Sequence, residues 1–344
     1  MEPGINPVQP NPQLVWDTIN AYQRTAALRA AIDLDLFTLI GEGERTAHEL
    51  AENSDASLRG IRILCDYLSV IGFLAKSRDT YRLTPTSDVF LNRKSPACMA
   101  TMARFLNSPK LMSGFTNFTE TIRLGETQLG SGGVNEPEFS EWVTFAEFMT
   151  PLMSSASKTI AEHCGEANSH RVRVLDVAAG HGLFGIAVAM RMPKAEITAQ
   201  DWPNVLEVAH RNAILTGIAD RYHLLPGSIL DVDLGEGYDV VLVTNLLHHF
   251  DERTCTHILR KIHRSLSDKG QLINLEFIPN EDRVSPPIPA TFSLMMLGLT
   301  PAGDAYTAHQ HEHMLFNAGF NKPCIIPVPQ SPQHLIISTK SIQT

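Results

Sequence analysis

Between residues 172 and 277, short apolar runs alternate with segments that repeat apolar residues at helical spacing. The strand-like runs are 172–177, 197–199, 223–225, 239–244 and 271–277. The helical segments between them are 183–192, 204–215 and 252–266. Parallel strands need a crossover connection, so this alternation predicts an α/β fold with a parallel, doubly wound sheet. Two later apolar segments, 324–328 and 334–339, are expected to form an antiparallel edge hairpin, and Gly270 is expected to be the C′ glycine of the last helix.

The first hundred residues have a different, mostly helical pattern. Apolar residues at helical spacing predict two helices between residues 14 and 40. Thr46 and Glu49 form a capping-box pattern that opens a short helix, and a longer helix is expected over residues 57–71. Two apolar runs on either side of the polar turn 77–80 predict a β-hairpin, which completes a winged-helix pattern. We therefore expect a winged-helix dimerisation domain over 1–100, a helical linker and substrate-pocket region over 101–168, and a catalytic domain over 169–344.

Charge and cysteine usage narrow the class of protein. The formal net charge of -9 disfavours a general nucleic-acid binder, because phosphate neutralisation needs surplus Lys and Arg. Five scattered cysteines with no CxxC pair indicate reduced thiols and a cytoplasmic protein. The first residues lack the pattern of a signal peptide, and no apolar run is long enough to predict a membrane span.

The loop 176–182, DVAAGHG, lies between a predicted strand and a predicted helix, where doubly wound sheets bind ligands. It lacks both the GKS/GKT of a phosphate loop and the third glycine of a dinucleotide loop, and its leading Asp176 suits a cationic ligand. Asp201 ends the next strand, where a carboxylate can accept hydrogen bonds from ribose hydroxyls. Ser228 and Ile229 follow the third strand, beside the expected position of an adenine ring. Together these features favour a nucleoside-containing cofactor.

The segments LDVAAGHG, QDWP, YDVVLVTNLLHHFDERTC, GQLINLEF and TPAGDAYT resemble the class I S-adenosylmethionine-dependent small-molecule O-methyltransferases. The resemblance covers nearly the whole chain and is weakest in the N-terminal third. It implies a Rossmann-like, seven-stranded doubly wound sheet preceded by a winged-helix dimerisation domain, and therefore a homodimer. It also implies S-adenosylmethionine as cofactor, a small-molecule acceptor and a role in secondary metabolism. By the resemblance, the cofactor contacts fall on Asp176, Ala178, Gly180, Gly182, Asp201, Trp202, Ser228, Ile229 and Thr244.

The resemblance also assigns the catalytic residues. By the resemblance, the general base falls on His248. A histidine suits this role, because it is neutral at cytosolic pH and can accept the proton of an attacking hydroxyl. Glu276, at the end of the fifth strand, falls where the family has one of two acidic residues that orient this base. The second acid is replaced by Ala305, and Ala178–Ala179 stand where relatives often have Gly-Gly. Alanine fits there if its φ is negative.

The acceptor pocket is expected to be apolar, for a flat, aromatic acceptor. Methionine adapts its shape to irregular rings, although plain core packing is at least as good an explanation for each such residue. His249 either lines this pocket or serves only packing and hydrogen bonding. The predicted acceptor contacts are Phe148, Met149, Met153, His249, Met295 and Met296, with Phe145 and Phe292 as further plausible walls of the pocket.

Three alternatives remain open. The missing acid at Ala305 leaves room for a carbon or nitrogen acceptor with the same cofactor. A winged helix could also bind DNA, but the predicted helix over 57–71 is apolar and offers only Arg59 and Arg62. His309 and His313 lie at i, i+4 and could bind a metal, but no third ligand follows from their spacing, so we expect none.

Overall fold

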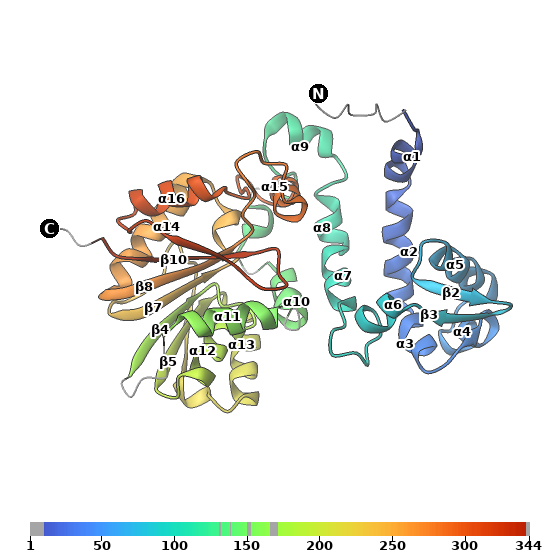
Figure 1. Ribbon diagram of the computed structural model, residues 1–344, viewed down its shortest axis with the longest axis horizontal. Helices are drawn as coiled ribbons and strands as arrows, with labels where there is room; N and C mark the ends of the chain where they lie inside the picture. The colour runs from blue at the N-terminus through green and yellow to red at the C-terminus, as the bar shows by residue number, and fades with distance from the viewer. Residues whose placement is uncertain (1–9, 131, 138, 150–152, 166–170, 342–344) are drawn as a thin grey trace, which may run out of the picture. The chain divides into compact units, whose positions relative to one another are not determined.

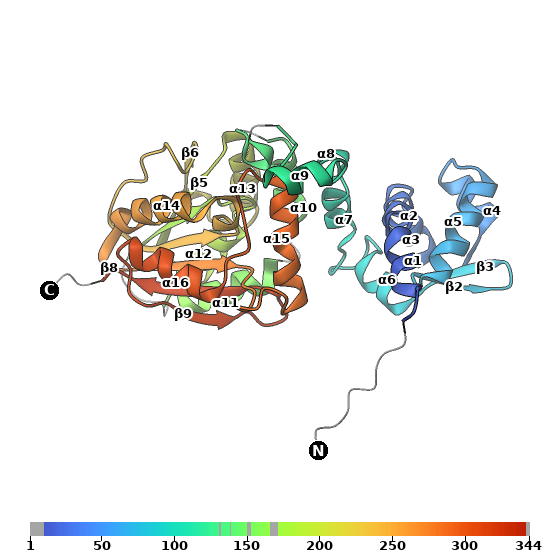
Figure 2. The same ribbon diagram turned by 90° about the horizontal axis from the view of Figure 1, so that it is seen from above.

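The computed structural model describes residues 10–130, 132–137, 139–149, 153–165 and 171–341 (Figures 1 and 2). The chain divides between Asn107 and Ser108 into two compact units. Each unit has its own hydrophobic core, centred on Leu36 and Leu68 in the first and on Val241 and Leu259 in the second. No helix among the described residues is long and apolar enough to cross a membrane.

The first unit is mainly helical and carries a three-stranded sheet in the order β1-β3-β2. Its helices are α1 Gln13–Ile19, α2 Ala21–Asp33, α3 Leu36–Gly41, α4 Ala47–Asn53, α5 Leu58–Val70, α6 Pro85–Phe90 and α7 Ala100–Leu106. Its strands are β1 Arg45–Thr46, β2 Leu74–Ser77 and β3 Thr80–Leu83. The predicted capping box of Thr46 and Glu49 opens α4, and the predicted hairpin pairs β2 with β3 antiparallel.

The segment predicted as two helices between residues 14 and 40 contains three. The break between α2 and α3 falls at Asp35, whose φ of 55° is left-handed and therefore outside a right-handed helix. Aspartate tolerates that conformation better than most residues, but single-sequence periodicity does not show it.

The second unit is built on a seven-stranded sheet in the order β6-β5-β4-β7-β8-β10-β9. Its strands are β4 Val172–Val177, β5 Ala195–Asp201, β6 Tyr222–Pro226, β7 Tyr238–Thr244, β8 Leu266–Glu276, β9 Cys324–Pro327 and β10 His334–Thr339. The first five run parallel, whereas β10 is antiparallel to β8 and β9 is antiparallel to β10. The prediction of a doubly wound α/β sheet with an antiparallel edge hairpin is confirmed.

Helices cover both faces of this sheet. The helices are α8 Pro109–Ser113, α9 Phe118–Leu124, α10 Glu141–Phe148, α11 Ser154–His163, α12 Leu183–Arg191, α13 Pro203–Leu215, α14 Glu252–Ser265, α15 Pro287–Leu299 and α16 Ala308–Asn317. Helices α11, α12 and α13 pack together on one face, and α14 and α16 on the other (Figure 1). The order reverses at the neighbouring strands β4 and β7, and doubly wound sheets bind their ligands beyond the carboxyl ends of such strands.

Two local details differ from the sequence expectations. Gly270 is not a C′ glycine: α14 ends at Ser265, and Gly270 lies inside β8. A side chain there would approach the carbonyl oxygen of Tyr238 to 2.7 Å, so close strand packing requires the glycine. Helix α15 was left unassigned by the sequence, because its apolar residues surround the whole helix and show little one-sided periodicity.

Candidate functional site

The cofactor loop, residues 178–182, connects β4 to α12. Gly180 has φ 57° and Gly182 has φ 75°, both in the left-handed region. A Cβ atom on Gly182 would lie 2.5 Å from the hydroxyl oxygen of Tyr222, so only glycine fits. A Cβ on Gly180 would meet no atom closer than 3.9 Å, which leaves open space against the backbone. Such a space can receive a ligand close to the main chain.

Ala178 departs from the expectation for its position. Its φ is 52°, whereas alanine was expected to fit there only with a negative φ. The left-handed conformation costs a non-glycine residue about 1–2 kcal/mol. By contrast, Ala179 has no positive φ and is buried, which agrees with the expectation.

Two aspartates give the cofactor loop a negative environment. Burial raises the pKa of Asp176 to about 7, although a hydrogen bond from the N–H of Gly185 lowers it in part. The other carboxylate oxygen of Asp176 has no hydrogen-bond partner among the described residues. Burial of its carboxyl group likewise raises the pKa of Asp201 to about 6. Asp201 accepts hydrogen bonds from the N–H groups of Gly180 at 2.8 Å and Trp202 at 2.7 Å. No Lys or Arg pairs with either aspartate in the described chain, so the loop suits a cationic group better than a phosphate.

Gln200 was missed by the sequence analysis, although it joins two parts of the cofactor region. Its side-chain oxygen accepts from the N–H of Ala178 at 3.3 Å, and its amide nitrogen donates to the carbonyl of Gly227 at 2.6 Å. The available signal was its position directly before Asp201, at the end of β5. Through Gln200, the loop that carries Ser228 and Ile229 is tied to the cofactor loop. Ser228 is half-buried there, whereas Ile229 is buried in the core beneath α14.

The candidate base lies on a short 3₁₀ helix, η4 Leu247–His249, which follows β7. The Nδ1 atom of His248 lies 2.5 Å from Oε2 of Glu276, the last residue of the neighbouring strand β8. Oε1 of Glu276 accepts from the N–H of Leu247 at 2.9 Å. Both side chains are buried. Burial by itself would raise the pKa of Glu276, but His248 and the Leu247 N–H reverse the effect and lower it. The structure thus brings together the predicted pair His248 and Glu276.

The turn that carries His248 is held at its backbone carbonyls. The thiol of Cys255 donates to the carbonyl of Leu247 at 3.0 Å, and the hydroxyl of Tyr306 donates to the carbonyl of Phe250 at 2.5 Å. Asn135 donates its side-chain amide to the carbonyl of His249 at 2.7 Å. Gly303 packs so closely that a Cβ there would lie 2.2 Å from the carbonyl oxygen of His248. None of these supports was predicted, although Gly303 lies in the quoted segment TPAGDAYT.

Aromatic rings surround the two histidines. Phe292 meets His248 edge-on at 4.9 Å between ring centroids and stacks on Phe277 at 4.3 Å. Trp142 meets His249 edge-on at 5.3 Å. Burial, and then the neighbouring His248, lower the pKa of His249 well below its usual value, so this imidazole is neutral. Phe292 and Trp142 therefore join His249 around the base; Phe292 was predicted as a wall of the acceptor pocket, whereas Trp142 was not.

The remaining predicted residues occupy several environments. Thr244, at the end of β7, is buried, and Trp202 is half-buried directly before α13. Met149, Met153 and Met296 are buried, and Met295 is half-buried, which fits either a pocket wall or core packing. The side chain of Phe148 lies outside the described residues. His309 and His313 do not belong to any group of three possible metal ligands within the described ranges.

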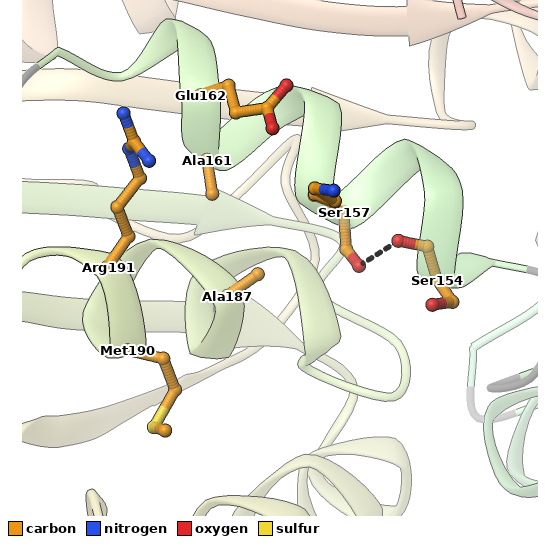
Figure 3. A pocket seen from close by; sticks show the side chains of 8 residues that line it. Ser154, Ser157, Ala161, Glu162, Ala187, Met190 and Arg191 are labelled. Atoms are coloured by element: carbon orange, nitrogen blue, oxygen red, sulfur yellow. Dashed lines mark hydrogen bonds between the residues drawn. The ribbon is translucent and has the colours of Figure 1, made fainter. Parts of the chain in front are cut away.

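Two surface hollows contain none of the predicted site residues. The larger, about 490 Å³, lies between α11 and α12 and is lined by Ser154, Ser157, Lys158, Ala161, Glu162, Ala187, Met190 and Arg191 (Figure 3). There Ser157 donates a hydrogen bond to the carbonyl of Ser154 at 3.0 Å. The other, about 430 Å³, lies beside the end of β8 and the start of β10. The candidate site is therefore defined by the convergence of polar groups at the sheet edge.

Comparisons with known proteins agree with this arrangement. An O-methyltransferase domain family matches residues 140–321, and an O-methyltransferase dimerisation domain matches residues 16–93. The tetracenomycin polyketide synthesis 8-O-methyl transferase TcmO of Streptomyces glaucescens is 27% identical over 307 residues, which cover 87% of this chain and 88% of that protein. The human N-acetylserotonin methyltransferase, solved with S-adenosylmethionine, shares the fold with a TM-score of 0.83 at 20% identity, over 98% of this chain and all of that one.

A solved structure of a candidate O-methyltransferase from Nostoc punctiforme is more similar in sequence. It is 45% identical, has a TM-score of 0.93, and the match covers 96% of this chain and 100% of that one. The dimerisation domain and the seven-stranded sheet thus both have counterparts in known proteins, and the resemblance inferred from the sequence is confirmed. The two domain matches and this relative show that the chain belongs to the family of S-adenosylmethionine-dependent O-methyltransferases.

Proposed function

We propose that the protein transfers the methyl group of S-adenosylmethionine to a hydroxyl of a small aromatic acceptor, with His248 as general base and Glu276 as the residue that orients it. The observation that carries the proposal is the 2.5 Å contact between these buried side chains. It lies at the same edge of the sheet as the cofactor loop, because β4, β7 and β8 are neighbouring parallel strands.

The residues of the cofactor region fit S-adenosylmethionine. When bound, this cofactor supplies a methyl group on a positively charged sulfur. The open space at Gly180 accommodates a ligand against the backbone, and the unpartnered oxygen of Asp176 suits an ammonium group. Asp201 can exchange its backbone partners for ribose hydroxyls. We assign the cofactor contacts to Asp176, Ala178, Gly180, Gly182, Asp201, Trp202, Ser228, Ile229 and Thr244.

The pairing with Glu276 selects the tautomer of the base. When Nδ1–H of His248 donates to the carboxylate, Nε2 keeps its lone pair and can accept a proton. As the acceptor oxygen attacks, its proton moves to Nε2, and the carboxylate stabilises the imidazolium that forms. The carbonyl contacts of the η4 turn keep the imidazole in place, so little reorganisation is needed during the reaction.

We infer an aromatic acceptor from the aromatic side chains that surround the base. Phe292 lies against His248, and Trp142 lies against His249. Such faces and edges favour a flat, apolar acceptor. The relative TcmO acts in polyketide synthesis, which supports a polycyclic phenol of secondary metabolism as the acceptor type. We propose Phe148, Met149, Met153, His249, Met295 and Met296 as further acceptor contacts.

Replacement of His248 tests the base. His248→Ala is expected to lower kcat by roughly 10²–10⁴-fold, the usual contribution of a positioned general base. Calorimetry should show unchanged affinity for S-adenosylhomocysteine, which demonstrates an intact cofactor region. A rate that barely falls at any pH would contradict base catalysis by His248 and favour an acceptor that needs no deprotonation, such as certain nitrogen or carbon centres.

We also propose a cytoplasmic homodimer formed through the N-terminal unit. The match to a dimerisation domain supports it, and so do apolar residues that α1 and the start of α2 leave exposed: Leu14, Val15, Trp16, Ile19 and Tyr22. The five free cysteines suit a reducing compartment. Trp16→Glu should shift the mass measured by light scattering from two chains to one, and an unchanged mass would remove α1 from the interface.

A further inference from the structure

The base His248 has an acid on one side only. Where the family has a second orienting acid, this chain has Ala305, whose side chain is fully buried. The adjacent Asp304 does not supply the missing group. Its carboxylate pairs with Arg283 at 3.1 Å and accepts from the N–H of Ala305 at 2.8 Å. Glu276 is thus left without a second acidic neighbour in this segment.

A second imidazole is buried against Tyr306, near the turn that carries the base. His311, on the inner face of α16, is 1% exposed, and neither of its ring nitrogens has a hydrogen-bond partner among the described residues. Its ring meets the ring of Tyr306 edge-on at 6.0 Å, and Tyr306 bonds to the turn of the base. Burial lowers the pKa of His311 to about 4, while the charge of Glu276 raises it and that of His248 lowers it.

The position of His311 is fixed from the start of α16. Thr307 caps the helix, and the side chain of Gln310 donates to Glu252 of α14 at 2.6 Å. The groups that face this interior region are Glu276 of β8, His248 of η4, Cys255 of α14 and Tyr306. Among the described residues, Glu276 is the carboxylate that acts on His311, whereas Asp251 and Glu252 act on Cys255 and Tyr306. The two oxygens of Glu276 retain lone pairs beyond the bonds to His248 and Leu247.

We propose that His311 is a positioning residue of the catalytic pair: its neutral imidazole donates an N–H to the Glu276 carboxylate through one buried water and thereby replaces the acid missing at Ala305. Buried polar groups rarely stay unpaired, and a single ordered water commonly joins two that do not touch. The contact keeps Glu276 ionised and directed at Nδ1 of His248. The inference rests on the proposed role of His248 as base.

Three variants of His311 test the role. His311→Phe and His311→Leu remove both nitrogens, and His311→Gln keeps a donor and an acceptor. We expect His311→Phe to lower kcat roughly tenfold, the effect of losing one hydrogen bond to a charged group, with unchanged KM for the acceptor. His311→Gln should recover most of the rate. Because a hydrogen-bond donor stabilises the ionised carboxylate, its removal in His311→Phe should raise the pKa of Glu276, and the loss of kcat at acidic pH should begin at higher pH.

Matched measurements separate this role from a structural one. His313→Phe alters an exposed imidazole of the same helix and should leave kcat and its pH profile unchanged. The inference is overturned if His311→Phe or His311→Leu folds and keeps the wild-type kcat and pH profile. It is also overturned if neither apolar variant folds while His311→Gln is fully active, because the imidazole would then serve folding alone. If His248→Ala itself keeps full activity, the proposed base fails, whatever the His311 variants show.

Discussion

The Nδ1 atom of His248 lies 2.5 Å from Oε2 of Glu276, and both side chains are buried although the residues are 28 positions apart in the sequence. The contact exists because β7 and β8 are neighbouring parallel strands, so the residues that follow or end them meet at one edge of the sheet. It determines which nitrogen of His248 faces the acceptor, and it is the relationship on which the proposed chemistry depends.

Glu276→Gln should preserve shape and remove the charge. An amide nitrogen facing Nδ1–H would be repelled, so the ring would turn or change tautomer, and the imidazolium would lose its counter-charge. We expect kcat to fall at least about 100-fold, with unchanged affinity for S-adenosylhomocysteine by calorimetry. Glu236→Gln, on an exposed turn, is the control. Equal kcat in the two variants would show that Glu276 does not orient the base.

Gly303→Ala should displace the base without touching either catalytic side chain. The new Cβ would lie 2.2 Å from the carbonyl oxygen of His248 and 2.6 Å from the hydroxyl of Thr300, so the η4 turn would have to move. A displacement of this kind costs roughly 100-fold in rate. Gly235→Ala adds strain from a positive φ but meets no atom within 4 Å, and steady-state kinetics should show no loss of activity there. Normal kcat in Gly303→Ala would mean that the turn tolerates the shift.

Ala178→Gly and Ala179→Gly should change the free energy of unfolding in opposite directions or by different amounts. At φ 52°, glycine relieves about 1–2 kcal/mol of strain at position 178, and the greater freedom of the unfolded chain offsets about 0.4–1 kcal/mol of that gain. Ala179 has no positive φ, so glycine there should destabilise the protein by about 1 kcal/mol. Urea unfolding of the cofactor-free protein measures both. Equal destabilisation by the two variants would contradict the strain at Ala178.

The raised pKa values of Asp176 and Asp201 predict how stability depends on pH. The carboxyls titrate near 7 and 6 in the folded state and near 3.8 when unfolded, so folding takes up protons between these values. Their contribution to stability is therefore largest below pH 4 and is lost as the pH rises through about 7, by at most about 1.4 kcal/mol per pH unit for each group. Thermal unfolding of the cofactor-free protein from pH 5 to 8 measures the trend.

Asp176→Asn isolates one of these groups. It should raise the melting temperature of the cofactor-free protein at pH 8, because an ionised buried carboxylate is removed, and it should weaken binding of the cationic cofactor. Wild-type protein should release protons on binding S-adenosylmethionine at pH 6.5, detectable by calorimetry in buffers of different ionisation enthalpy. Asp268→Asn, at an exposed position, is the control. A lower melting temperature in Asp176→Asn would show that the buried charge stabilises the fold.

Much of the site could be predicted because its residues follow strands. Apolar runs and helical periodicity are local patterns, and so is the capping box at Thr46, which the structure contains as expected. Once the sheet is parallel, the residues after β4, β5, β7 and β8 must gather at one edge. Asp176 and Asp201 were found in this way, whereas His248 and Glu276 were assigned by the resemblance to the O-methyltransferase family.

The supports of the site could not be predicted, because they join residues far apart in sequence. Asn135 reaches the carbonyl of His249 across 114 positions, and Tyr306 reaches that of Phe250 across 56. Neither contact leaves a periodic signal in the chain. The positive φ of Ala178 could not be predicted either, since such a conformation is expected at Gly, Asn or Asp and not at alanine.

The sequence by itself determined the alternation of strands and helices, the glycine positions of the cofactor loop and the residues at the strand ends, because hydrogen-bonding periodicity and backbone sterics act between near neighbours. Only the tertiary structure decided which histidine pairs with Glu276, how the turn of the base is held, and that the imidazole of His311 is buried against Tyr306. These features depend on burial and on contacts between distant segments, which exist only after the sheet and its covering helices have packed together.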